Sequence, residues 1–267
     1  MGFAKIIWTA LFASVVAGQT LTIPTRAGSI ISLSAPSAIS GSKDLGNREY
    51  DRGRSCETDV ETPGGHPVFI LEDGATLSNV IIGAGQVEGI HCRGACTLKN
   101  VWFRRACDFA SPPPTIMLRY RSLVKIIRKT NFLNQPDSII LNGNGNVLVE
   151  GGGVQGRAET AVFHKGRGTV TVKNFTAIDS GRLYRSCGDC FNNGGPRNIV
   201  VENLKAKNIN LIAGINSNFG DTATVAGSCG AGVTKVCQEF KGVNKGQESP
   251  KVTTTANCKG QLSLGAC

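Results

Sequence analysis

The stretch FILEDGATLSNVIIGAGQVEGIHCRGAC, residues Phe69–Cys96, decides the fold that this sequence predicts. Two short apolar runs, Val68–Leu71 and Asn79–Ile82, lie along it and are separated by polar corners that contain glycine. Each run is too short for a helix and is rich in β-branched residues, so each indicates a strand. The unit TLSNV at 76–80 then returns in varied form as TLKNV at 97–101, TVKNF at 171–175 and VVENL at 200–204. A repeat of this kind determines the architecture of a chain.

The spacing of the repeat indicates a solenoid. Asn79 and Asn100 are 21 residues apart, Asn174 and Asn203 are 29 apart, and Gly151 takes the asparagine position in a further copy. Periods of about 20–30 residues, made of short strands and Gly or Asn corners, are typical of a β-solenoid. An asparagine side chain satisfies backbone groups at a tight bend and tolerates left-handed backbone.

We therefore predict an all-β, single-domain parallel β-helix, with an antiparallel sandwich as the alternative. Stacked coils need equivalent residues in register, so the apolar positions of the repeat should form continuous internal rows. These positions are Leu77, Val80, Leu98, Val101, Val172, Phe175, Val201 and Leu204.

The first 18 residues have the layout of a secretory signal peptide. One positive charge lies in residues 1–5, an apolar run of twelve residues follows at Ile6–Ala17, and Ala17 and Gly18 are small residues suited to cleavage. The apolar run is too short to span a bilayer. We expect residues 19–267 to form one secreted, soluble domain that has no membrane contact after cleavage.

The ten cysteines agree with export, because oxidised pairs are the expected state outside the cell. Cys92 and Cys96 form a CxxxC pair and Cys187 and Cys190 a CxxC pair, spacings that zinc ligands also use. The secretory context favours disulfides over zinc. The connectivity of the ten cysteines does not follow from the sequence.

Composition and the two ends of the chain suit a solenoid as well. Glycine is frequent, at 34 residues, and aromatic residues make up only 6%, as expected for many corners and thin stacked sheets. We expect Gln19–Ser55 to form the first strands and a cap at one end. Gly242–Thr255 is polar and rich in turn residues, so we interpret it as a surface tail fastened by Cys258 and Cys267.

The net charge of +10 is concentrated in one place. The segment Arg104–Gln135 contributes +6 of it, so overall basicity is weak evidence for an anionic partner. A nucleic acid is not an expected partner of an exported, disulfide-rich protein.

Residues 111–141 look foreign to the rest of the chain. Ser111–Pro114 contains three prolines in a row, and the stretch after them lacks the glycine corners that occur elsewhere. We interpret 111–141 as an atypical insert and expect it to be the least regular part of the fold. An inserted binding loop, a basic amphipathic helix laid over the solenoid and an artefact of the gene model, such as retained intron sequence, remain as explanations.

Several long strings together resemble the fungal secreted pectate lyases of polysaccharide lyase family 3. They are FILEDGATLSNVIIGAGQVEGIHCRGACTLKNVW, NVLVEGGG, GRGTVTVKNFTAIDSGRLYRSCGDC, NGGPRNIVVENLKA and AGINSNFGDTATV. The resemblance covers roughly residues 51–241 apart from the foreign segment. It implies a right-handed parallel β-helix, a calcium cofactor, and eliminative cleavage of de-esterified polygalacturonate (pectate). The enzyme is expected to be a monomer with polygalacturonate as its partner.

The chemistry of that reaction defines the residues to look for. The C5 proton of a galacturonate is α to a carboxylate, so its removal builds negative charge on an anionic group. Calcium held by protein carboxylates stabilises that charge, a basic side chain takes the proton, and cations offset the developing charge. Acids for calcium, together with Lys or Arg facing the same groove, are therefore expected.

The resemblance assigns residues to these roles. Glu88, in EGIH, matches the acidic calcium position, and Arg182 and Arg185, in GRLYR, match the catalytic basic pair of the family motif GKLYR. Strict alternation would put Arg182 and Arg185 on opposite faces of a strand, so a bend near Arg182 is needed for both to reach one groove. Asn174, in Asn-Phe-Thr, is the candidate glycosylation site.

The sequence departs from the family in two places. The acidic pattern WEDVCEDA stands here as WFRRACDFA at 102–110, where Asp108 alone keeps a carboxylate as a calcium ligand. The motif DKVFQ, which brings the presumed base lysine, stands as Thr160–His164, with Ala161 in the lysine position. Glu159, one residue before the motif, is a substitute metal ligand, and His164 and Lys165 are nearby groups that do not match it.

Two classes of function remain open at this stage. One is a pectate lyase with a partly rebuilt site, and the other is a catalytically impaired relative that still binds acidic polysaccharide through Arg182, Arg185 and the basic segment. A hydrolase on the same solenoid would need a tight cluster of aspartates, which Asp179 and Asp189 do not form by their spacing.

Overall fold

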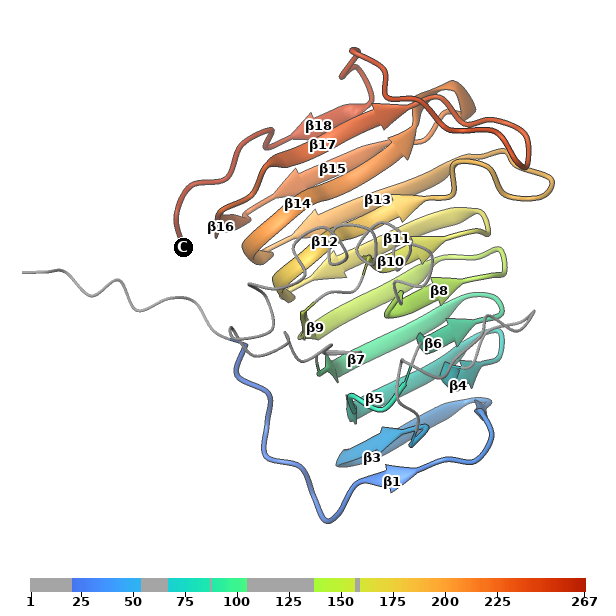
Figure 1. Cartoon of the computed structure of the whole chain (residues 1–267), viewed down its shortest axis with the longest axis vertical. Helices are drawn as coiled ribbons and strands as arrows, with labels where there is room; N and C mark the ends of the chain where they lie inside the picture. The colour runs from blue at the N-terminus through green and yellow to red at the C-terminus, as the bar shows by residue number, and fades with distance from the viewer. Residues whose placement is uncertain (1–20, 54–66, 87, 105–136, 157–158) are drawn as a thin grey trace, which may run out of the picture.

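The described residues form one parallel sheet that winds into a solenoid. The computed structural model describes residues 21–53, 67–86, 88–104, 137–156 and 159–267. The strands stack from β1 at one end to β18 at the other (Figure 1). They are β1 (Ile31–Ser32), β2 (Ser37–Ile39), β3 (Ser42–Asp51), β4 (Pro67–Leu71), β5 (Ala75–Ile82), β6 (Glu88–Cys92), β7 (Cys96–Phe103), β8 (Ile139–Leu141), β9 (Val147–Gln155), β10 (Thr160–His164), β11 (Gly168–Lys173), β12 (Thr176–Ser186), β13 (Arg197–Glu202), β14 (Lys205–Asn216), β15 (Ala223–Ala226), β16 (Cys229–Ala231), β17 (Lys235–Phe240) and β18 (Cys258–Gly260), with a short 3₁₀ helix at Ser217–Phe219.

Most pairings skip one strand, because most coils contribute two strands to the stack, whereas β9 with β12, β14 with β17 and β15 with β18 skip two. Thus β5 pairs with β7 and β7 with β9, while β6 pairs with β8, β8 with β10 and β10 with β12. Every pairing between these strands in the described part is parallel. This confirms the parallel β-helix and rules out the antiparallel sandwich.

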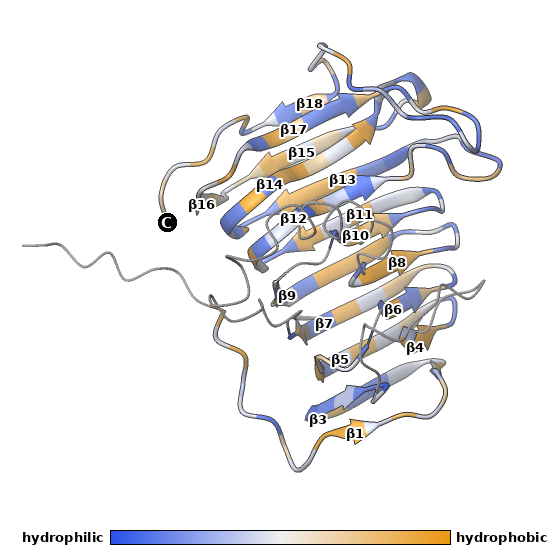
Figure 2. Cartoon of the chain, in the orientation of Figure 1, coloured by the Kyte–Doolittle hydropathy of each residue, from blue (hydrophilic) through white to orange (hydrophobic). Residues whose placement is uncertain are grey.

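The apolar rows inside the solenoid are those predicted from the repeat. The eight predicted inward residues are each at most 1% exposed and belong to one hydrophobic cluster. Register explains this, since Leu77 pairs with Leu98 and Leu98 with Val149, while Val172 pairs with Val201. Figure 2 shows the hydrophobic segments running along the strands through successive coils.

The repeated asparagines lie at corners with left-handed backbone. The φ angles of Asn79, Asn100, Asn174 and Asn203 lie between 51° and 53°, and Gly151, in the same position, has a φ of 66°. Side-chain amides connect neighbouring coils: Asn100 Nδ2 donates to Asn79 Oδ1 at 3.1 Å, and Asn203 Nδ2 to Asn174 Oδ1 at 3.2 Å. A Cβ at Gly151 would collide with Asn100 Oδ1, so glycine ends this asparagine ladder.

Replacing Asn100 by alanine is expected to lower the free energy of unfolding by about 1–2 kcal/mol. Alanine lacks the ladder hydrogen bond and is strained in left-handed backbone. Asn100→Gly is the matched control, because glycine adopts the same φ and loses only the hydrogen bond. Urea unfolding should show the wild type to be most stable, Asn100→Gly less stable and Asn100→Ala least stable. Equal stability of the two variants would show that alanine is not strained at this position.

Disulfides occupy the positions that zinc could have used. Cys92 bonds to Cys96 and Cys187 to Cys190, so the zinc alternative is wrong at both pairs. The C-terminal region is closed by Cys229–Cys267 and Cys237–Cys258, which confirms that Cys258 and Cys267 fasten the tail that precedes them.

The segment 111–141 differs from the expectation at its C-terminal end. Residues 139–141 form β8, which pairs with β6 and with β10, so this part is a regular element of the solenoid and not an irregular insert. The rest of the segment, residues 111–136, and the signal peptide at 1–18 lie outside the described residues. Within the described ranges, no helix is long and apolar enough to cross a membrane.

Candidate active site

One row of polar residues lies at the same level of four neighbouring coils, at or near β6, β8, β10 and β12. Ile90 pairs with Ile139 and Ile139 with Val162, which places Glu88, Asp137 and Thr160 at one level of the stack. Thr160 pairs in turn with Arg182. Since adjacent strands lie about 4.8 Å apart, the four residues span only about 14 Å. The row therefore brings carboxylates and a cationic side chain together from residues nearly a hundred positions apart.

Asp137 lies at the centre of the charges in this row. Burial, and then the negative charges of Glu159 and Glu88, raise the pKa of Asp137 to about 7, against the opposing effect of Lys165 and Arg182. Two of its neighbours are paired: Glu88 Oε2 lies 2.9 Å from His91 Nε2, and Glu159 Oε1 lies 3.1 Å from Arg182 Nη1. The site thus holds crowded carboxylates of which one keeps its proton near neutral pH.

These carboxylates are the described side chains that could contribute ligands to a calcium ion. Calcium prefers oxygen ligands, which are all that Glu88, Asp137 and Glu159 offer. In the described ranges, no three His, Cys, Asp or Glu side chains converge closely enough to enclose a metal. Asp108, the other expected ligand, lies outside the described residues.

A break in the strand alternation puts both predicted arginines on the outer side of β12. Leu183 and Tyr184 are consecutive, and both are fully buried in the core. The residues that flank them, Arg182 and Arg185, consequently both face outward, and the positive charge of Arg182 reaches Arg185. Strict alternation is therefore broken at Leu183 and Tyr184, which is the irregularity that both arginines need to reach one side of the strand.

The two arginines have different surroundings. The side chain of Arg182 is 37% exposed and contacts Glu159, which is 40% exposed. Arg185 is only 7% exposed: its guanidinium lies 3.9 Å from the centre of the Phe240 ring and donates to Asn216 Oδ1 at 3.0 Å and Ser249 Oγ at 3.1 Å. Burial, followed by the charge of Arg182, lowers the pKa of Arg185 to about 10.

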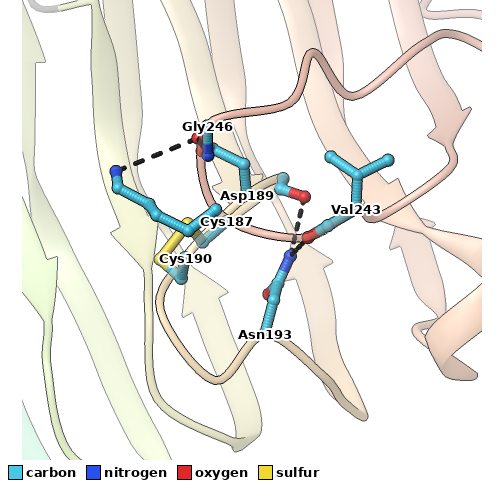
Figure 3. Close-up of polar contacts among 8 residues, drawn as sticks. Cys187, Asp189, Cys190, Asn193, Val243 and Gly246 are labelled. Atoms are coloured by element: carbon cyan, nitrogen blue, oxygen red, sulfur yellow. Dashed lines mark hydrogen bonds and ion pairs between the residues drawn. A yellow bond between two sulfur atoms is a disulfide. The ribbon is translucent and has the colours of Figure 1, made fainter.

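Two segments that are bonded to each other, the loop after β12 and the C-terminal tail, cover the side of the site where Arg185 lies. Figure 3 shows the loop after β12, which the disulfide Cys187–Cys190 closes, against the C-terminal tail. Asn193 Nδ2 donates to the carbonyls of Gly188 at 2.7 Å and Val243 at 3.0 Å. An ion pair of 3.9 Å between Lys245 and Asp189 adds a weaker link. These contacts hold Ser249 and its segment over Arg185.

The position matching the family lysine does not face the groove. Ala161 is 1% exposed and lies in the hydrophobic core. His164 is fully buried, its Nδ1 lies 2.9 Å from Tyr184 Oη, and burial lowers its pKa to about 3, so it is neutral and internal. Lys165, by contrast, is exposed and lies within electrostatic reach of Asp137.

Asp137 is the site residue that sequence reasoning missed. It lay in the segment interpreted as foreign, and no family motif was matched to it. A signal was present, however, since Asp137-Ser138-Ile139-Ile140-Leu141 repeats the order of Glu88-Gly89-Ile90-His91-Cys92: an acid, a small residue and a short apolar strand.

Comparison with known proteins agrees with this geometry. The chain matches the family model described as pectate lyase over residues 20–112 and 136–247. It is similar to probable pectate lyase E of Neosartorya fischeri, with 36% identity over 92% of this chain and 86% of that protein. It is also similar to pectate lyase H of Emericella nidulans, with 37% identity over 87% of this chain and 79% of that protein.

Solved structures give the same result. The catalytic domain of pectate lyase PelI from Erwinia chrysanthemi superimposes with a TM-score of 0.65 and 30% identity, covering 86% of this chain and 96% of that one. PelI in complex with tetragalacturonic acid gives 0.62 and 32%, covering 83% and 67%. The expected right-handed parallel β-helix is thereby confirmed. Residues 113–135 fall outside the family match, whereas Asp137 falls within it.

Proposed function

Because the chain belongs to the pectate lyase family, we propose that it cleaves de-esterified polygalacturonate by calcium-dependent β-elimination. The observation that carries the proposal is the position of Asp137 between Glu88 and Glu159, with the cation of Arg182 beside them. An anionic polymer needs cations to bind, and elimination next to a carboxylate needs positive charge where the negative charge develops.

The charged residues of the site have separate parts in this reaction. Asp137 and Glu88 would hold calcium, which supplies a Lewis acid for the substrate carboxylate. Glu159 competes with the substrate for Arg182, so a galacturonate carboxylate would displace it and bind the exposed guanidinium. Arg185 stays behind Arg182 as a buried positive charge that favours the developing anion.

The direct test is the growth of unsaturated product, measured by its ultraviolet absorbance, with purified protein and polygalacturonate. Product should form with calcium at alkaline pH and stop when the calcium is chelated. Methyl-esterified pectin should be a poorer substrate, because esterification removes the charge that the cations bind. Calcium-aided binding without any product would instead favour the catalytically impaired alternative.

We also propose that the protein acts outside the cell as a monomer. Four disulfides link described cysteines, and bonds of this kind persist in oxidising compartments. The signal-peptide layout of residues 1–18 supports the same location.

Asn174 is the proposed glycosylation site, and a secreted preparation from a fungal host should carry a glycan there. It is exposed and stands at a corner, in the only Asn-x-Ser/Thr sequence of the chain. An endoglycosidase should reduce the mass of the wild type and leave Thr176→Val unchanged. Equal masses of the two proteins before treatment would refute the assignment.

A further inference from the structure

Elimination needs a proton acceptor, and the matched residues do not supply an accessible one. Ala161 has no basic group and points into the core. Arg182 is paired with Glu159, and the Nη1 and Nη2 groups of Arg185 both donate hydrogen bonds within the protein. A guanidinium is also a poor proton acceptor compared with an amine.

Hydrogen bonds fix the backbone of Lys165, the residue directly after β10. Its amide N–H donates to the carbonyl of Leu141 at 2.9 Å. Its own carbonyl accepts from Arg197 Nε at 3.1 Å and Nη2 at 2.8 Å. Because Arg197 is 2% exposed, a buried cation fixes the backbone from which the Lys165 side chain extends.

The side chain of Lys165 runs back along β10 toward the carboxylates. Its Nζ lies 5.6 Å from the centre of the Phe163 ring, two residues earlier in the strand. Phe163 pairs with Ile140 of β8 on one side and with Arg185 of β12 on the other. The amine is therefore on the outer face, between the strand that follows Asp137 and the strand that carries both arginines.

Charge places the amine in the same group of residues. Lys165 is one of the two cations that act on Asp137, the other being Arg182. Within the described part of the chain, no carboxylate lies within ion-pair distance of Lys165 Nζ, unlike Arg182. An exposed amine that has no ion-pair partner there and that acts on a proposed calcium ligand is suited to meet an incoming substrate.

We propose that Lys165 is the catalytic base of the elimination and substitutes for the lysine that is missing at position 161, an inference that rests on the proposed function. In its neutral form, Nζ takes the C5 proton of a galacturonate. The electron pair of the C5–H bond forms the C4=C5 double bond as the C4–O glycosidic bond breaks. The departing oxygen takes a proton from water, and Lys165 returns its proton to solvent, so the step is balanced without an oxidant or reductant.

The test compares Lys165→Met and Lys165→Arg with the control Lys173→Met, whose lysine is paired with Glu150 at 3.1 Å in another part of the solenoid. Lys165→Met should lower kcat about 10²–10⁴-fold, as expected for loss of a base. Lys165→Arg keeps the charge, so it should retain KM within a few-fold and still lose kcat. The control should behave as the wild type, and thermal melting should show all the variants folded.

Two results would overturn the inference. If Lys165→Arg retains wild-type kcat, the residue supplies only charge, and if Lys165→Met retains it, the residue takes no part. A wild-type protein that forms no unsaturated product with calcium would instead overturn the proposed function, and the assignment of a base with it. The wild-type rate thus distinguishes a failure of the Lys165 assignment from a failure of the proposed function.

Discussion

Replacing Asp137 by asparagine is expected to lower the rate of calcium-dependent elimination by about 100-fold or more. Asparagine keeps the shape of the side chain but loses the negative charge that holds the ion, and disturbing even the supporting residues of a metal site typically costs about 10–100-fold. Calcium titration of the rate should show that higher calcium partly restores activity. Glu150→Gln, which removes a carboxylate from the ion pair with Lys173 on the outside of β9, is the matched control.

The same substitution should stabilise the calcium-free protein. The pKa of Asp137 is about 7 in the folded state against 3.8 for the free residue, so the folded protein binds more protons between these values. Its stability therefore falls as the pH rises from about 4 to about 7, and asparagine removes that loss. One pKa unit corresponds to about 1.4 kcal/mol, and rearrangement around the ionised carboxylate lowers part of the cost of burying it. We therefore expect Asp137→Asn to raise the free energy of unfolding by about 1–3 kcal/mol at pH 8.

Unfolding in chelator at pH 5 and pH 8 checks this prediction. The free energy of unfolding of Asp137→Asn should exceed that of the wild type by more at pH 8 than at pH 5. Calcium should reverse this order of stability if the wild type alone binds the ion. A variant that is destabilised at both pH values would show that Asp137 has a structural role and no connection with cation binding.

Replacing Arg197 by methionine is expected to lower the free energy of unfolding by about 3–5 kcal/mol. The guanidinium is 2% exposed and donates to the carbonyls of Lys165 and Gly166 and to Asn193 Oδ1. Methionine fills a similar space but leaves these buried acceptors without donors. Urea unfolding measures this loss of stability, which is large because the one guanidinium joins three segments of the chain.

Arg93→Met is the control for this prediction. Arg93 also makes an ion pair, with Glu72 at 2.7 Å, but its side chain is 58% exposed, so its removal should change stability by less than about 1 kcal/mol. Comparable losses in the two variants would contradict the role assigned to burial. Arg197→Met should also reduce activity in the fraction that stays folded, because Arg197 fixes the backbone of Lys165.

The parts of the fold that repeat locally were predictable from the sequence. Corners at Asn79 and Asn203 and buried rows at Leu98 and Val172 follow from a period and from the preference of asparagine for left-handed backbone. These properties depend on a few neighbouring residues, and the same solution recurs in each coil.

The site was less predictable, because it depends on how coils deviate from the repeat. Alternation separates Arg182 from Arg185, and only the consecutive burial of Leu183 and Tyr184 brings both to one side. Asp137 belongs to the row because β8 stacks between β6 and β10, and the prolines and basic residues before it concealed that strand in the sequence. Long-range register, which no local pattern encodes, decided both cases.

Arg104 and Asp137 end two described ranges of the chain, and neighbouring coils anchor the backbone at both points. The amide of Arg104 donates to the carbonyl of Ile82 at 2.9 Å, and β8 begins two residues after Asp137. The described strands on either side keep a fixed register with their neighbours: β7 with β5, and β8 with β6 and β10. One residue added inside β6 or β8 would therefore turn every following side chain of that strand to the opposite face.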